Sequence, residues 1–119
     1  MNVFRFTSPV RAEGRFIRQS GPPGHYGHVV LSVEPSSQSD LSFSWEVDDD
    51  QIPPMFKAAV YQGVEVLFEP DARFHGFACE NTVVRVVGGS FHETDSKELS
   101  FKMAAAEAFS KAVTAAKLA

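Results

Sequence analysis

The alternation of apolar and polar residues predicts short β-strands at residues 3–6 and 14–19. Residues 26–34 are rich in β-branched side chains, which also favours an extended conformation. In the next segment an apolar side chain recurs at every second position, at Leu41, Phe43, Trp45 and Val47. One face of that strand is therefore expected to be buried. A further buried strand is expected at residues 82–87.

Helical spacing replaces this alternation at about residues 53–69. Pro53 or Pro54 suits the first turn, where a missing N–H group costs nothing. The spacing predicts one apolar stripe, made of Phe56, Val60, Val64, Leu67 and Phe68. Gly63 interrupts good helix formers, which indicates a place where two backbones approach closely.

A second helix is expected at about residues 96–117. Asp95 suits the N-cap position, and Glu98 stands three residues later, where it completes a capping box. The expected buried face consists of Leu99, Met103, Ala106, Phe109 and Val113. Seven alanines in this helix would let it lie close to a sheet.

The order β-β-β-α-β-α favours the α+β class, with a predominantly antiparallel four-stranded sheet and two helices on one face. A chain of 119 residues is long enough for one domain, residues 1–119, with its own core. The single cysteine, Cys79, excludes an intrachain disulfide and suits a reducing cytosol. No segment suits a membrane span or a signal peptide, so we expect a soluble, cytoplasmic protein without a membrane partner.

The net charge of −4 is unevenly distributed. Residues 1–30 hold four arginines and one acidic residue, for +3, whereas residues 31–99 hold four basic and thirteen acidic residues, for −9. This balance argues against a general polyanion-binding protein. Two interpretations fit the four arginines of the first part of the chain: a local basic edge that binds a partner, or a solvated strand face. These residues are Arg5, Arg11, Arg15 and Arg18.

Two motifs resemble the fourth domain of translation elongation factor G, and the resemblance covers about residues 10–117. The first is Gln-Ser-Gly-Pro-Pro-Gly-His-Tyr-Gly-His-Val at residues 19–29. The second is Gly-Ser-Phe-His-Glu-Thr-Asp-Ser-Lys-Glu at residues 89–98. Between them, Ile52-Pro53 opens the middle helix as in the family.

The resemblance implies a left-handed βαβ crossover, against the usual rule, and two motif loops that lie together at one tip. In the family this domain enters the decoding region of the small ribosomal subunit. His92 takes the position of the family's tip histidine. The resemblance therefore implies an interface with the ribosome or with structured RNA at loops 20–26 and 88–94, built from Ser20, Gly21, Pro22, Pro23, Gly24, His25, Tyr26, Ser90, Phe91 and His92.

The chain departs from the family pattern at Pro23, where the family has arginine, and at His25, where it has glutamine. A guanidinium that could hold phosphate is thus replaced by an apolar turn. The chain also has no Gly-x-x-x-x-Gly-Lys-Ser/Thr loop. We therefore expect a stand-alone domain IV-like protein without GTPase activity, nucleotide or other cofactor.

Each candidate residue also has a purely structural interpretation. His92 either contacts RNA or is an exposed or capping histidine. Tyr26 and Phe91 either stack on bases or pack the root of a loop. Ser90, His92 and Asp95 resemble a hydrolytic trio, but Asp95 is better used at the helix start and no oxyanion element is evident.

Metal binding and catalysis are not expected. His25 and His28 would point to opposite faces of a strand, and the pair His75 and Cys79 lacks further ligands. We expect a non-enzymatic protein that binds the ribosome or structured RNA and modulates translation. The alternative is a repurposed module that binds a protein partner or forms a homodimer, without contact to RNA.

Overall fold

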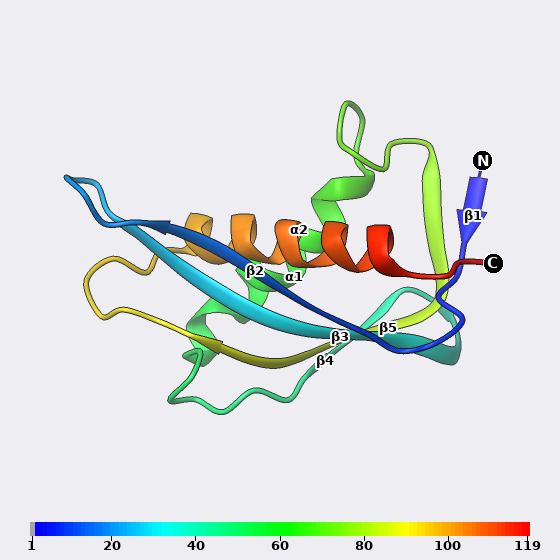
Figure 1. Ribbon diagram of the computed structural model, residues 1–119, viewed down its shortest axis with the longest axis horizontal. Coiled ribbons are helices and arrows are strands. Elements are labelled where there is room, and N and C mark those ends of the chain that lie inside the picture. The colour runs from blue at the N-terminus through cyan, green and yellow to red at the C-terminus, as the bar shows by residue number, and fades with distance from the viewer. Residues whose placement is uncertain (1) are drawn as a thin grey trace.

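The computed structural model describes residues 2–119, which form one mixed sheet and two main helices (Figure 1). The strands are β1 (Asn2–Phe4), β2 (Val10–Arg18), β3 (His25–Asp40), β4 (Ser42–Trp45) and β5 (Phe77–Ser90). The helices are α1 (Lys57–Glu65), flanked by the 3₁₀ turns η1 (Pro54–Phe56) and η2 (Val66–Phe68), and α2 (Glu98–Ala115). The α+β class is confirmed, but the sheet has five strands instead of four.

The sheet has the order β1-β5-β3-β2. β4 also pairs with β5, at Val83–Val86, whereas β1 pairs with the start of β5, at Phe77–Cys79. β3 is antiparallel to both β2 and β5, whereas β1 and β4 run parallel to β5. The long ladders are thus antiparallel and the short ones parallel, which makes the sheet mixed. The parallel strands β4 and β5 are joined through α1. The left-handed connection that the resemblance implies for this unit stays a prediction.

Helix α2 lies directly on β2 and β3, because both strands present a glycine beneath it. A side chain at Gly14 would collide with the carbonyl group of Ala104, and one at Gly27 would collide with that of Ser100. α1 packs beside α2, and Gly63 faces the carbonyl group of Lys102 there. The expectation of close backbones at Gly63 is confirmed.

The middle helix is less regular than its spacing suggests, since the single helix expected at 53–69 is a 3₁₀ turn, an α-helix and a second 3₁₀ turn. Its apolar stripe is confirmed in the first part, where Phe56, Val60 and Val64 are buried in the core. Leu67 and Phe68 are only partly buried against it.

The last helix starts later than expected, and a different face is buried. The helix begins at Glu98, and the hydroxyl group of Ser100 accepts a hydrogen bond from the N–H group of Lys97, 3.2 Å away. Asp95 is therefore not the N-cap. Leu99 and Met103 were expected in the core but are exposed. The buried residues are Ser100, Phe101, Ala104, Ala105, Ala108, Phe109, Ser110 and Ala112.

The buried face of α2 differs from the expected one because α2 lies very close to the sheet. Over Gly14 and Gly27 there is room only for small side chains, so the alanines turn inward, as the sequence indicated. The larger Leu99 and Met103 are left on the outer side. Neither described helix is long and apolar enough to cross a membrane.

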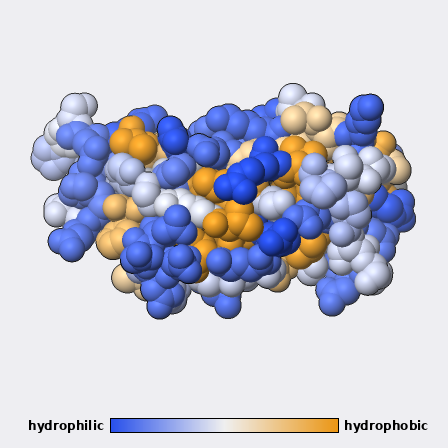
Figure 2. Space-filling model, turned by 60° about the horizontal axis from the view of Figure 1, so that its bottom comes forward, coloured by the Kyte–Doolittle hydropathy of each residue, from blue (hydrophilic) through white to orange (hydrophobic). Residues whose placement is uncertain are grey.

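The opposite face of the sheet carries no helix and holds a cluster of charges around Arg85. Its guanidinium group donates hydrogen bonds to Glu34 at 2.5 Å and to Glu46 at 2.6 and 2.8 Å. Hydrogen bonds from Arg85 and then Ser44 lower the pKa of Glu46 from 4.5 to about 2. From the side on which β3, β4 and β5 lie in Figure 1, apolar residues form a central band broken up by hydrophilic ones (Figure 2).

Candidate functional site

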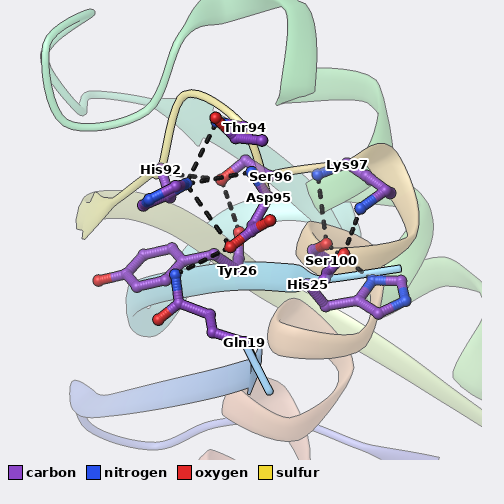
Figure 3. Close-up of polar contacts among 10 residues, drawn as sticks. Gln19, His25, Tyr26, His92, Thr94, Asp95, Ser96, Lys97 and Ser100 are labelled. Atoms are coloured by element: carbon purple, nitrogen blue, oxygen red, sulfur yellow. Dashed lines mark hydrogen bonds and ion pairs between the residues drawn. The ribbon is translucent and has the colours of Figure 1, made fainter. Parts of the chain in front are cut away.

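The β2–β3 turn and the loop between β5 and α2 meet at one end of the molecule, the tip, formed by residues 19–26 and 88–97 (Figures 1 and 3). The side chain of Gln19 donates a hydrogen bond to the carboxylate of Asp95, at 3.1 Å. The backbone N–H of Tyr26 donates to the carbonyl group of Asp95, also at 3.1 Å. Two segments about seventy residues apart in sequence therefore form one surface.

Further contacts fix the turn against the start of α2. The ammonium group of Lys97 donates to the carbonyl group of Gly24, and the hydroxyl of Ser96 donates to that of Tyr26 at 2.7 Å. A Cβ atom at Gly24 would lie too close to the carboxylate of Asp95, so that this side chain would have to move. Glycine at position 24 thus lets the carboxylate of Asp95 lie against the turn, where it accepts from Gln19.

The imidazole of His92 is half-exposed and has one nitrogen turned inward (Figure 3). Its Nδ1 atom accepts hydrogen bonds from the backbone N–H groups of Thr94, at 3.2 Å, and Asp95, at 3.1 Å. The acceptor role leaves the proton on Nε2 in the neutral ring. The ring therefore closes its own turn and keeps one N–H donor at Nε2, outside this turn.

The other predicted tip residues divide into an exposed and a packed set. Ser20, Gly21, Pro22 and Pro23 are exposed, and Gly24 and His25 are partly buried. The Nδ1 atom of His25 lies 3.1 Å from the hydroxyl of Ser100, and its ring meets Phe16 edge-on. Phe91 packs against the core. His25 and Phe91 thus hold the root of the tip.

Tyr26 and Ser90 belong to a polar network on the helix-free face of the sheet. The hydroxyl of Ser90 lies 2.8 Å from that of Tyr26 and 2.9 Å from Nδ1 of His28. The Nε2 atom of His28 lies 3.4 Å from the carboxylate of Glu13, which also accepts from Arg15. The ring of Tyr26 stands beside that of His92, with 6.2 Å between centroids. The network therefore reaches from the strands to the tip histidine.

The trio of Ser90, His92 and Asp95 does not form a relay. Ser90 bonds to Tyr26 and His28, whereas the inner nitrogen of His92 is occupied by backbone N–H groups. In residues 2–119 no three potential metal ligands converge. What the arrangement offers chemically is a shaped surface with a few fixed donors and acceptors.

Sequence reasoning missed Glu13, His28, Lys97 and Ser100 as supports of the tip. His28 and Glu13 come together only through the pairing of β2 with β3, where Arg15 lies opposite His28 and Glu13 opposite Val30. The register of β2 against β3 cannot be predicted from motif spacing or from the alternation of apolar and polar residues. Ser100 could have been found as a buried polar residue in the first turn of a helix.

The comparisons with known proteins agree with this geometry. Residues 4–117 match the family described as elongation factor G, domain IV. The chain belongs to this family. An elongation factor G from Petrotoga mobilis is 39% identical over 112 residues, which are 92% of this chain and 16% of that protein. The resemblance seen in the two motifs is confirmed.

A crystal structure of a protein from Thermus thermophilus contains the same fold, with a TM-score of 0.83 and 30% identity. The match covers 97% of this chain and 17% of that one. The chain therefore spans about a sixth of the length of both relatives. The match identifies a domain related to a translation elongation factor, and says nothing of the activity of a whole factor.

Proposed function

We propose that this domain binds the ribosome or structured RNA through tip loops 20–26 and 88–94, without catalysis of its own, and thereby modulates translation in the cytoplasm. The single observation that supports this most is the meeting of the two family motifs at one end of the molecule (Figure 3). A surface of this kind is preorganised, because its two loops are fixed by each other before any partner arrives.

The chemistry of the tip suits RNA that is recognised by shape. The exposed turn at residues 20–23 projects beyond the strands (Figure 1), and the half-exposed imidazole of His92 belongs to the same tip. Arg18 is exposed at the root of this turn, with its guanidinium group 5.0 Å from the centre of the Phe16 ring. Exposed donors and the guanidinium group of Arg18 at a narrow end can contact phosphates and base edges of a folded RNA.

Co-sedimentation with purified small ribosomal subunits tests the proposal. We expect the wild-type domain to be retained at low salt and less so at high salt, since contacts to phosphate release counterions. His92→Ala should reduce retention about threefold to tenfold, the loss of one or two hydrogen bonds. His75→Ala is the matched control, because His75 is an exposed histidine outside the tip. Equal retention of both variants would contradict the assignment.

The second candidate is a module that binds a protein and no RNA. It is favoured by Pro23, which stands where the family has an arginine, and by the net charge of −4. Retention by neither subunit at low salt would support it. Restoring the cation with Pro23→Arg separates the two, because an RNA-binding tip should then bind more tightly, whereas a protein-binding surface elsewhere should not change.

A further inference from the structure

A groove of about 630 Å³ lies on the outer side of α2, away from the tip network. One wall is Phe16 of β2, and the opposite wall is Leu67 and Arg73. Its floor is the outer side of α2, and includes Met103, Glu107, Ser110 and Lys111. The volume is in the range of natural ligand sites, and the lining is mainly apolar.

Two observations distinguish this groove from an ordinary surface depression. Met103 is 44% exposed, although it belongs to a helix whose inner face is filled by alanines. Ser110 is buried, since only 7% of it is accessible, and yet its hydroxyl group donates to no other residue within 2–119. The hydroxyl group of Ser110 is therefore a polar group at the lining of an apolar groove, where a ligand can contact it.

The groove opens beside a free sheet edge. Within the described chain, β2 pairs only with β3, so the other side of its backbone carries N–H and C=O groups that no strand satisfies. β2 runs alongside α2 in Figure 1. An edge strand next to a helix, with an apolar groove between them, is the arrangement that accepts an added strand from a partner.

The charges around this edge determine which strand would fit. Arg11 and Arg15 project from the side of β2 that faces away from α2, since Gly14, between them, faces the helix. Arg73 lies at the groove, where Lys111 is paired with Glu107. Arg15 is also paired, with Glu13 at 3.0 Å, so it is Arg11 and Arg73 that leave this edge locally positive on a chain of net charge −4. The edge is therefore complementary to an acidic segment.

We propose that β2 and the groove beside α2 bind an extended acidic peptide segment of a partner protein, which adds to the sheet as a further strand. Side chains of a strand alternate between two faces. The segment therefore has apolar residues that enter the groove over Met103 and Ser110, and acidic residues that lie across from Arg11 and Arg15. Phe16 of the groove contacts His25 at the root of the tip, but neither the exposed turn at residues 20–23 nor His92 lines the groove, so both surfaces can be occupied together.

Fluorescence anisotropy with a labelled nine-residue peptide of alternating glutamate and valine tests the proposal. We expect the wild-type domain to bind this peptide, and to bind an alternating lysine–valine peptide and a polyadenosine ten-mer at least about tenfold more weakly. Binding of either comparison probe with equal or higher affinity would overturn the assignment to an acidic peptide.

Two variants, Met103→Asp and Arg15→Glu, and one control, Met55→Asp, locate the site. Met103→Asp should weaken binding at least about tenfold, because a carboxylate enters an apolar groove. Met55→Asp should leave binding unchanged, since Met55 is 73% exposed and outside the groove. Arg15→Glu should weaken the glutamate peptide and strengthen the lysine peptide. Unchanged binding by Met103→Asp would exclude the groove.

Amide hydrogen exchange distinguishes an added strand from other occupants. In the complex, amides of residues 10–18 should exchange more slowly, because a new strand accepts their hydrogen bonds. Protection confined to α2 would indicate a docked helix and overturn the proposal. A dimer in analytical ultracentrifugation that Met103→Asp dissociates would assign the groove to a second copy of this chain, and would overturn it as well.

Discussion

The amide of Gln19 donates a hydrogen bond to the carboxylate of Asp95, 3.1 Å away and 76 residues later in the chain. This contact joins the start of the β2–β3 turn to the loop before α2. The sequence suggested that Asp95 caps the last helix, but in the structure its carboxylate faces Gln19 and Gly24 instead. The residue therefore couples two loops, and its role is to shape the tip.

Asp95→Ala should loosen the tip while the rest of the fold is kept. The carboxylate loses its bond to Gln19, which we expect to lower the free energy of unfolding by about 1 kcal/mol. Retention by small ribosomal subunits should fall by at least as much as with His92→Ala, because both loops are affected. Asp49→Ala, in the exposed Asp48–Asp50 turn, is the control. Retention equal to that of the control would show that the loops act independently.

Gly14→Ala should destabilise the domain by about 1–3 kcal/mol, since the new Cβ atom would push against the carbonyl group of Ala104 and move α2 off the sheet. Gly88→Ala is the matched control in the same sheet. A Cβ atom there would meet only Val30, at an ordinary 3.4 Å. Urea unfolding measures both, and equal midpoints for the two variants would refute the close packing of α2 on β2.

Ser100→Ala should lower the free energy of unfolding by about 1–2 kcal/mol, because the hydroxyl of Ser100 is fully buried, accepts from the N–H of Lys97 and meets Nδ1 of His25. Ser110→Ala is a suitable comparison on the same helix, because that hydroxyl forms no bond within residues 2–119. Thermal unfolding followed by circular dichroism should show a clear decrease for position 100 alone.

Glu46→Gln should make the free energy of unfolding depend less on pH in the acidic range. Hydrogen bonds from Arg85 and Ser44 lower the pKa of Glu46 in the folded state to about 2, from 4.5 when unperturbed. A lowered carboxyl pKa contributes stability above pH 4.5, and this contribution is lost as the pH falls toward about 2.

Urea midpoints measured between about pH 6 and pH 2 check this sign, since the wild type should lose more stability over that range than Glu46→Gln. Glu65→Gln is a control on an exposed helical site. If the wild type and Glu46→Gln lose stability in parallel, the cluster around Arg85 makes no contribution of this kind.

Local sequence patterns predicted where the helices and strands lie better than they predicted which side of each is buried. Alternation and helical spacing placed the strands and both helices, and Gly63 correctly marked a close approach of backbones. The buried side of α2 was wrong, because Leu99 and Met103 are good core residues by type. Which side of a helix faces the sheet depended on Gly14 and Gly27, far away in sequence, which admit only alanine-sized neighbours.

At the tip, too, the sequence predicted the position of the segments but not the roles of their side chains. The two motifs predicted that loops 20–26 and 88–94 lie together, and the geometry agrees. The motifs did not show that His25 and Phe91 turn inward, or that His92 uses Nδ1 to close its own turn. Those roles depend on the backbone path of residues 92–97 and on strand register, and residue spacing predicts neither of them.

Directed hydroxyl-radical probing tests the central claim most directly. An iron chelate is attached at Thr94→Cys in the tip (Figure 3), or at Lys117→Cys near the C-terminus, which lies at the opposite end (Figure 1). The native Cys79 is buried, and burial raises the pKa of its thiol, so it should stay unlabelled. With small ribosomal subunits, we predict strong RNA cleavage from position 94 and little from position 117. Cleavage from position 117 alone, or from neither position, would contradict an RNA-binding tip.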